Sequence, residues 1–365
     1  MLRRIKKILS FLYNNFVSRN NPVSLVHFIT NRCNARCSFC FIDFGNPETF
    51  KDELGLDEID KLTRNLGNNL LNINITGGEP FARKDISQIL DLYCKNTTIE
   101  SIYITSNGSL PERALKTLTY ITEKYKDIKI NVQLSIDDIG ERHDKIRKIN
   151  NLFDSAIETF HSLKKIDNVY PIVGITVSLE NSSRVIEIYN ILKNDYNINA
   201  FKAIAVRDEG VYKTPIKDKL KILEAYKQLS DLIIKDSNEK IITNYNYDKL
   251  KSKLHFHKDK LMYAYIKRNF LNPKYESRCY AGGLFGIIGS KGEIYACEIL
   301  NEKKIGNLRD HDFNFIKLWK SEENKKVKNY IKKTNCNCTY ECALAFNFLG
   351  NYRYQLGFFK SLFDY

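Results

Sequence analysis

The stretch FITNRCNARCSFCFID, residues 28–43, decides the fold because it places three cysteines within one short loop. Cys33, Cys37 and Cys40 are separated by three and then by two residues. A zinc knuckle offers a C-x-x-C pair with a fourth Cys or His close by, and none follows within this loop. The loop therefore either takes a fourth ligand from a distant part of the chain or leaves one coordination position open.

The composition is that of a globular protein. The chain has 365 residues, of which 43% are hydrophobic and 27% charged, and it is long enough for one large and one smaller domain. No apolar run approaches the ~18–20 residues of a membrane span, and the amino terminus lacks a signal-peptide pattern. The net charge is +14, but Lys and Arg are intermixed with Asp and Glu along the whole chain. We therefore expect a cytoplasmic protein without a nucleic-acid partner.

The nine cysteines fall into two groups and one isolated residue. The second group comprises Cys279, Cys297, Cys336, Cys338 and Cys342. In a chain without a secretion signal, grouped thiols indicate metal ligation rather than disulfides. Cys94 stands alone on a predicted helix, where we expect an inert core thiol.

Short β-branched runs alternate with helical stretches from residue 24 onward. Six strands are predicted, at 24–30, 70–75, 101–105, 128–136, 171–179 and 200–206. Helices are predicted at 56–67, 85–95, 111–125, 153–166, 182–195 and 215–236. Such repetition predicts an α/β fold with a parallel sheet and right-handed crossovers, either open or closed as a barrel.

Unusual residues follow four consecutive predicted strands. The three-cysteine loop follows the first strand, TGGEP (76–80) the second and TSNGS (105–109) the third, and SIDD (135–138) ends the fourth. The carboxyl ends of parallel strands form the active-site face of barrel-like α/β folds. We therefore expect the four segments to meet at one mouth.

The alternation stops near residue 237. We expect a hairpin within 283–299 that turns at Ser290–Gly292, then a helix at 313–333 and the segment CNCTYEC at 336–342. The predicted segments are an amphipathic helix at 1–21, a barrel at 22–236, a helical connector at 237–276, a small α+β cysteine-rich unit at 277–345 and an aromatic-rich tail at 346–365.

A [4Fe–4S] cluster has one ligand position per iron, so three thiolates leave one iron open to a small molecule. An alternative is a zinc site completed by His27, His143 or a remote cysteine.

The C-x-x-x-C-x-x-C spacing, with Phe39 before the last cysteine and GGEP downstream, resembles the radical S-adenosylmethionine (SAM) superfamily over residues 22–210. The resemblance implies a partial (β/α)6 TIM-like barrel. It also implies a [4Fe–4S] cluster held by Cys33, Cys37 and Cys40, which reductively cleaves SAM to a 5′-deoxyadenosyl radical.

The resemblance also implies cofactor contacts at Phe39, Gly77, Gly78, Glu79, Ser106, Asn107, Ser135 and Arg147. The Gly-Gly-Glu segment would meet the SAM ammonium, because glycines allow close backbone approach and a carboxylate attracts a cation. Arg147, in SIDDIGERHDKIR, would bind the SAM carboxylate, and the serines and Asn107 would approach the ribose. A solvated Arg147 at a helix start and a plain turn at Asn107 are the alternatives.

Gly292 lies five residues before Cys297, and this spacing after Cys279 resembles the SPASM and twitch auxiliary-cluster domains. A full SPASM domain needs more than the five cysteines found here, so the resemblance implies one auxiliary [4Fe–4S] cluster. Its ligands would be Cys279, Cys297 and two of Cys336, Cys338 and Cys342, with structural zinc as the alternative. Glu298 occupies the place of a general base, although a surface glutamate also fits.

Two substrate classes remain open, with a non-catalytic iron–sulfur sensor as a remote third. The first is oxidative modification of a ribosomal peptide. Many peptide maturases carry a winged-helix recognition segment ahead of the barrel, and the short stretch before the first strand at residue 24 weakens this class without excluding it. The second is dehydrogenation, epimerisation or rearrangement of a small-molecule, sugar or lipid-linked substrate. We also expect a flavodoxin- or ferredoxin-type electron donor. The amino-terminal helix packs on the barrel or contacts a membrane through an apolar face, formed by Leu2, Ile5, Ile8, Leu9, Leu12 and Phe16.

Overall fold

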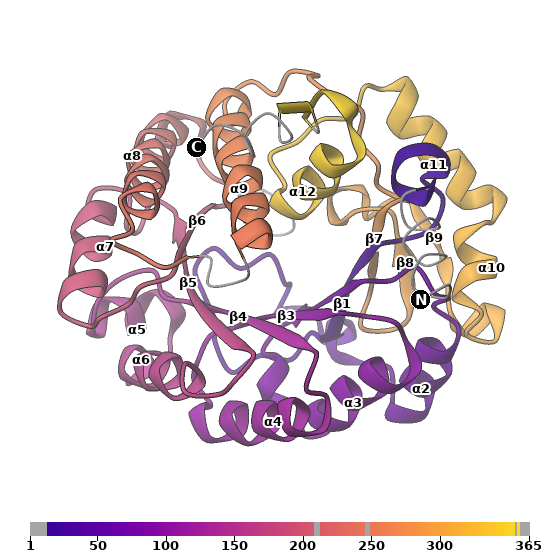
Figure 1. The fold of residues 1–365 in the computed structure, drawn as a ribbon, viewed down its shortest axis with the longest axis horizontal. Coiled ribbons are helices and arrows are strands. Elements are labelled where there is room, and N and C mark those ends of the chain that lie inside the picture. Colours follow the sequence, from indigo (N-terminus) through magenta and orange to yellow (C-terminus); the bar gives the residue numbers. More distant parts are fainter. Residues whose placement is uncertain (1–12, 208–211, 245–248, 355, 358–365) are drawn as a thin grey trace.

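The computed structural model describes residues 13–207, 212–244, 249–354 and 356–357 (Figure 1). Its nine strands form one sheet in the order β6-β5-β4-β3-β2-β1-β7-β8-β9. The strands are β1 Ser24–Thr30, β2 Asn72–Gly77, β3 Ser101–Ser106, β4 Lys129–Ser135, β5 Val169–Val177, β6 Phe201–Ala205, β7 Phe285–Ile288, β8 Glu293–Tyr295 and β9 Lys304–Asn307. The first six pair in parallel with their neighbours, as predicted.

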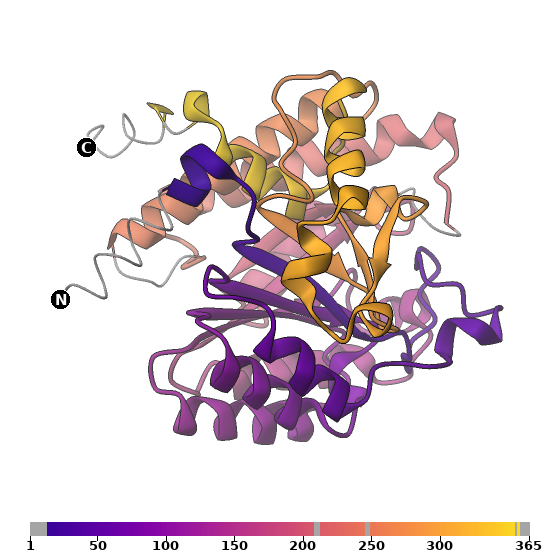
Figure 2. The ribbon, with the colours of Figure 1, turned by 90° about the vertical axis from the view of Figure 1, so that its right-hand side faces the viewer.

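Helices cover the outside of these six strands. They are α2 Leu56–Arg64, α3 Ile86–Asn96, α4 Pro111–Lys124, α5 Glu141–Arg147, α6 Leu152–Leu163, α7 Val185–Asn194 and α8 Lys219–Asn238. The later helices are α9 Lys249–Asn269, α10 Phe315–Trp319, α11 Glu322–Lys333 and α12 Glu341–Gly350. Figure 2 shows α2, α3 and α4 below the curved sheet and α9, α11 and α12 above it. The predicted partial barrel is therefore confirmed.

The two faces of the barrel strands differ in polarity, because side chains alternate along each strand. Ile73, Ile102 and Ile130 are fully buried in the core that also contains the residues of α2, α3 and α4. Asn74 and Tyr103, one position further along, are half-buried and lie on the opposite, inner face. The inner face thus carries polar side chains on β2 and β3, beside the apolar Val26 and Phe28 of β1.

A hydrogen-bonded group closes one end of this interior. The Asn72 side chain donates to Ser101 Oγ at 3.0 Å and accepts from Ser24 Oγ at 3.0 Å. Asn74 Nδ2 also donates to Ser24 Oγ at 3.0 Å. These residues lie at the amino ends of β1, β2 and β3, opposite the predicted mouth.

The free edge of β6 is covered by side chains rather than by another strand. The N–H groups of Phe201, Ala203 and Ala205 alternate along this edge. They donate to Asn244 Oδ1 at 2.6 Å, to Tyr263 Oη at 3.2 Å and to Glu341 Oε1 at 3.4 Å. Unpaired edge groups attract other chains, so α9 and α12 close the open side of the barrel.

The cysteine-rich unit continues the barrel sheet. β7 pairs in parallel with β1, and the β7–β8 hairpin forms as predicted, with Gly292 donating to Gly289 O at 3.1 Å. The single predicted helix at 313–333 is wrong. It is divided into α10 and α11 at Ser321, whose Oγ accepts from Asn324 N at 3.3 Å and begins the second helix.

The apolar face predicted at the amino terminus lies almost wholly outside the described residues, which begin at Tyr13. None of the described helices is long and apolar enough to cross a membrane. Burial raises the pKa of Cys94 to about 12, which fits an inert thiol.

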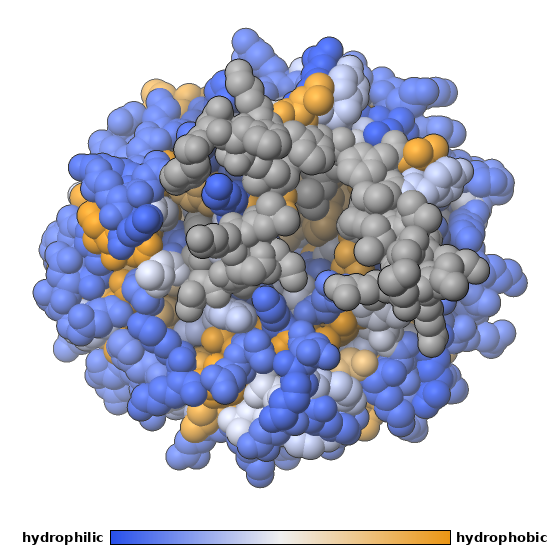
Figure 3. All heavy atoms as spheres, viewed as in Figure 1, coloured by the Kyte–Doolittle hydropathy of each residue, from blue (hydrophilic) through white to orange (hydrophobic). Residues whose placement is uncertain are grey.

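On the face in Figure 3, hydrophilic side chains cover most of the described surface, and hydrophobic ones form small patches.

Candidate cluster and cofactor site

The three-cysteine loop leaves the carboxyl end of β1 and lies against the end of α5. Arg36 N donates to Arg147 O at 3.0 Å, and Ser38 N donates to Ile146 O at 3.3 Å. Ala35, between the first two cysteines, is buried. The loop therefore has a fixed place at the barrel mouth.

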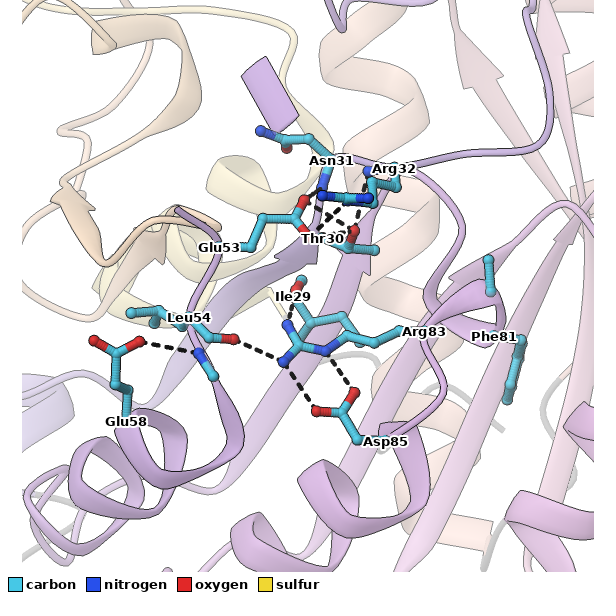
Figure 4. Close-up of polar contacts among 12 residues, drawn as sticks. Ile29, Thr30, Asn31, Arg32, Glu53, Leu54, Glu58, Phe81, Arg83 and Asp85 are labelled. Atoms are coloured by element: carbon cyan, nitrogen blue, oxygen red, sulfur yellow. Dashed lines mark hydrogen bonds and ion pairs between the residues drawn. The ribbon is translucent and has the colours of Figure 1, made fainter. Parts of the chain in front are cut away.

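Two charged side chains hold the base of the loop (Figure 4). Both carboxylate oxygens of Glu53 accept from Thr30 Oγ1 at 3.0 Å. Arg83 donates to Ile29 O, to Leu54 O at 2.7 Å and to Asp85. These contacts border a hollow of about 370 Å³ beside the loop, but the chain itself already engages Glu53 and Arg83.

The Gly-Gly-Glu segment lies against the backbone that continues β1. Gly78 N donates to Thr30 O at 2.8 Å, and Glu79 N donates to Arg32 O at 2.9 Å. A Cβ atom on Gly77 would lie 1.9 Å from Thr30 O, and one on Gly78 would lie 2.1 Å from Arg32 O. Gly77 also has a φ of +136°, which disfavours a side chain. Both glycines are needed to seat the cysteine loop.

Glu79 is buried and bound by the chain. Its Oε1 accepts from Phe81 N at 3.0 Å and from Ser106 Oγ at 2.9 Å, and its Oε2 accepts from Asn107 N at 2.7 Å. Burial raises the pKa of Glu79, while these donors and Arg147 act in the opposite direction. Its carboxylate thus joins the end of β2 to the end of β3.

Asn107 contacts the cysteine loop directly. Its Nδ2 donates to Asn34 Oδ1 at 2.9 Å and lies 3.9 Å from Cys33 Sγ. Ser106 Oγ accepts from Gly108 N at 3.0 Å, so its hydroxyl is engaged within the turn. Ser135 ends β4 with 8% of its surface exposed. These residues lie at the mouth as expected. Asn107 bonds to the cysteine loop, whereas Ser106 bonds to Glu79 and to its own turn.

Arg147 is the last residue of α5 and has only 7% of its surface exposed, so the solvated alternative is wrong. Its Nε and Nη2 donate to Asp137 Oδ2 at 2.8 and 2.6 Å, and its Nη1 lies 3.7 Å from Cys37 Sγ. The guanidinium carbon is 5.9 Å from the centre of the Phe39 ring. Burial alone lowers the pKa of Arg147, but Asp137 and Cys37 raise it above its usual value.

The thiols fit a [4Fe–4S] cluster better than a single metal ion. Burial raises the pKa of Cys33 to about 12 and also raises the pKa values of Cys37 and Cys40, and a bound metal favours the thiolate form. Within the described ranges, no three His, Cys, Asp or Glu side chains converge on one metal-ion position. A zinc ion needs four ligand atoms at about 2.0–2.3 Å from the metal. In a [4Fe–4S] cluster, by contrast, each thiolate binds a different iron. N–H donors at Cys33 and Cys37 also suit sulfur ligands.

The second cysteine group lies between the hairpin and α12. Burial raises the pKa of Cys297, and Cys338 and Cys279 raise it further. Burial also raises the pKa of Cys279 to about 11, with Cys336 acting in the same direction. Cys342 packs against the barrel residues Val26, Phe28 and Ile287 as well as the main core. Cys279 and Cys297 therefore lie near Cys336 and Cys338, and Cys342 packs on the barrel side.

Asp137, Arg83 and Arg207 are site residues that sequence reasoning missed. Asp137 stood in the quoted SIDD segment, but nothing local indicated its partner on α5. Arg207 follows β6 and forms an ion pair with Glu298, with 2.5 Å between Nη1 and Oε2. A cation placed directly after a barrel strand was the available signal.

The comparisons with known proteins agree with this geometry. The sequence model described as "Radical SAM superfamily" matches residues 28–190. Fe-coproporphyrin III synthase of Methanosarcina barkeri (strain Fusaro / DSM 804) is 25% identical over 329 residues, which cover 86% of this chain and 77% of that protein. The sporulation killing factor maturation protein SkfB of Bacillus subtilis (strain 168) is 25% identical over 182 residues, and the match spans only 41% of its length.

Solved structures show the same fold at low identity. Native anSMEcpe with bound AdoMet and Kp18Cys peptide aligns with a TM-score of 0.60 and 18% identity, covering 94% of this chain and 96% of that one. Streptococcus suis SuiB bound to precursor peptide SuiA aligns with a TM-score of 0.59 and 16% identity, covering 90% of this chain and 71% of that one. Both alignments extend beyond the six-stranded barrel.

Proposed function

Because the chain is an enzyme of the radical SAM superfamily, with a [4Fe–4S] cluster and SAM as cofactors, we propose that it oxidatively modifies a ribosomal peptide or protein. When bound, these cofactors supply a 5′-deoxyadenosyl radical that removes a hydrogen atom from an unactivated C–H bond. The main support for this proposal is that the cysteine loop, the Gly-Gly-Glu segment and Arg147 meet at the mouth of the barrel.

Cys33, Cys37 and Cys40 are the proposed ligands of the SAM-binding cluster. Arg147 binds the SAM carboxylate, because it is a buried cation that already touches Cys37 Sγ at 3.7 Å. Glu79 holds Ser106 and Asn107 in place rather than meeting the cofactor itself. The main-chain carbonyls of the Gly-Gly-Glu segment, held close to the loop, remain suited to an ammonium group.

The substrate enters the polar interior of the barrel. Tyr103 donates to Gln133 Oε1 at 2.9 Å across β3 and β4, and Lys202 Nζ lies 5.7 Å from the centre of the Tyr103 ring. Polar, partly exposed side chains in a barrel indicate a binding chamber rather than a packed core. The peptide substrates named for anSMEcpe and SuiB support a peptide here as well.

The carboxyl-terminal cysteines would hold one auxiliary [4Fe–4S] cluster, which would supply an electron acceptor for the oxidation of the substrate radical. Its proposed ligands are Cys279, Cys297, Cys336 and Cys338, because Cys342 packs against the barrel residues Val26, Phe28 and Ile287. Glu298, directly after a proposed ligand, accepts the proton released when the substrate radical is oxidised. A flavodoxin- or ferredoxin-type protein supplies the electron that starts the reaction.

A second candidate is modification of a carboxylated small molecule. The match to Fe-coproporphyrin III synthase favours it, because that match extends over 86% of this chain. Lys202 on β6, whose Nζ lies 5.7 Å from the centre of the Tyr103 ring, gives this side of the interior a positive charge for such a substrate.

Iron content and SAM cleavage test the proposal. The anaerobically reconstituted wild type is expected to hold about eight irons, and the Cys33/Cys37/Cys40→Ala variant about four. The variant is also expected to lose dithionite-dependent SAM cleavage. A Cys279/Cys297→Ala variant is the matched control, which loses about four irons but still cleaves SAM. SAM cleavage by the Cys33/Cys37/Cys40→Ala variant would overturn the assignment of the cysteine loop as the catalytic site. A wild-type content of about four irons would show that the proposed auxiliary cluster is absent.

A further inference from the structure

We propose that Asp137 is a positioning residue for SAM, because it holds Arg147 so that only one part of the guanidinium faces the cysteine loop. This inference rests on the proposed contact between Arg147 and the SAM carboxylate. The side chain of Asp137 has no exposed surface, so it acts on the open mouth through Arg147.

The hydrogen bonds define the orientation of the guanidinium. Nε and Nη2 of Arg147 both donate to the same oxygen, Oδ2 of Asp137, at 2.8 and 2.6 Å. An arginine side chain has five N–H donors in a rigid plane. The donors left are both N–H groups of Nη1, which lies 3.7 Å from Cys37 Sγ, and the second N–H of Nη2. A carboxylate that arrives over the loop therefore meets this end of the guanidinium.

Asp137 is itself fixed by three neighbouring segments. Its Oδ1 accepts from Thr176 N on β5 at 2.9 Å. Its N–H donates to His143 Nδ1 on α5 at 3.1 Å, and its carbonyl accepts from Asn181 Nδ2, after β5, at 2.8 Å. With both carboxylate oxygens and both main-chain groups engaged, Asp137 cannot turn without breaking contacts to β5 and α5. The orientation of Arg147 is thus set by the barrel and not by the loop.

The next residue provides a matched control. Asp138 belongs to the same turn, its side chain is 3% exposed, and it forms an ion pair with Arg184 at 2.7 Å. Arg184 also pairs with Glu187 on α7, and none of its described contacts involves the cysteine loop. Both aspartates are therefore buried and paired with arginine, but only Asp137 is connected to the site.

Equilibrium dialysis with labelled SAM tests the inference without turnover. The proteins are full-length, anaerobically reconstituted, not reduced and matched in iron content. Asp137→Asn is expected to weaken SAM binding roughly 10-fold or more, the effect of a disturbed hydrogen bond to a charged group. Asp138→Asn is expected to stay within about 2-fold of the wild type. In an Arg147→Met background, Asp137→Asn is expected to add nothing, because it acts through the arginine.

The outcomes separate the two levels of the proposal. If Arg147→Met binds SAM like the wild type, the proposed role of Arg147 is wrong. If Arg147→Met is impaired but Asp137→Asn binds like Asp138→Asn, only the positioning role of Asp137 is overturned. Removing one partner of a buried pair destabilises the fold, so Asp137→Glu is the second variant. It keeps the charge but displaces the guanidinium, and normal SAM binding by this variant would also overturn the inference.

Discussion

The guanidinium of Arg207 joins the end of β6 to the carboxylate of Glu298, with 2.5 Å between Nη1 and Oε2. The same guanidinium lies 4.4 Å from the centre of the Tyr340 ring and 6.0 Å from that of Phe41. Phe41 follows Cys40, and Glu298 follows Cys297. One side chain therefore links the two proposed cluster regions.

Arg207→Ala is expected to lower the free energy of unfolding by about 1–2 kcal/mol, since it removes a half-buried ion pair and a cation–π contact. Chemical denaturation measures the change. Arg309→Ala, which breaks the more exposed pair with Glu58, is expected to lose less than about 1 kcal/mol. Equal losses in the two variants would show that the Arg207 pair contributes no more than a surface contact.

Cys338 and Cys342 are expected to differ in iron binding. Cys338→Ala removes a proposed auxiliary ligand and is expected to reduce the iron content by up to about four atoms. Cys342→Ala is expected to retain the wild-type content, because that thiol packs against the barrel residues Val26, Phe28 and Ile287. Iron and sulfide analysis of the two reconstituted variants decides which of the two cysteines is a ligand. A reversed result would make Cys342 the ligand and Cys338 the spare.

Gly78→Ala is expected to prevent correct seating of the cysteine loop. Its methyl group would lie 2.1 Å from the backbone oxygen of Arg32, and a main-chain atom cannot move aside as a flexible side chain does. We expect insoluble protein or loss of the iron at the loop. Gly55→Ala is the control, because its nearest neighbour would be Glu58 Oε2 at 3.9 Å. Soluble, fully loaded Gly78→Ala protein would refute the close backbone approach.

Glu79→Gln is expected to lower the free energy of unfolding by about 2–4 kcal/mol, because an amide NH₂ would face an N–H donor in a buried site. The donors are Phe81 N, Ser106 Oγ and Asn107 N. Glu123 on α4 is exposed, so Glu123→Gln is expected to change stability by less than about 0.5 kcal/mol. Urea unfolding compares the variants, and a loss no larger than the control's would contradict the buried network.

His27 is expected to make stability fall at mildly acidic pH. Burial lowers the pKa of His27 from 6.5 to about 3, and Arg83 contributes in the same direction. The unfolded chain therefore binds a proton below pH 6.5 that the folded chain does not, and the stabilising effect is lost as the pH falls from 6.5 towards 3. His27→Gln is expected to reduce the slope of the free energy of unfolding against pH by up to about 1.4 kcal/mol per pH unit. Parallel stability curves between pH 5 and 7 would contradict this.

The barrel was predictable because its signals are local. The six strands are short β-branched runs, and the four special segments follow them directly, so their meeting at one mouth follows from parallel pairing alone. The predicted second strand was placed at 70–75 instead of Asn72–Gly77. Leu70 and Leu71 extend the apolar run, but Leu71 N already donates to Val23 O before β2 begins.

The remaining features depend on contacts between distant segments. Nothing near residue 285 indicates that β7 adds to β1, because the pairing joins segments about 260 residues apart. The burial of Arg147 depends on Asp137, ten positions earlier. The three donors to Glu79 likewise become visible only when β2 and β3 lie side by side.

The covered edge of β6 has a consequence for how a peptide is bound. Many proteins recognise extended peptides by adding them as one more strand to an exposed sheet edge. Here Asn244, Tyr263 and Glu341 already accept from the outward N–H groups of β6. A peptide substrate therefore cannot be aligned by main-chain pairing with these three N–H groups, and contacts at the β6 edge must come from its side chains.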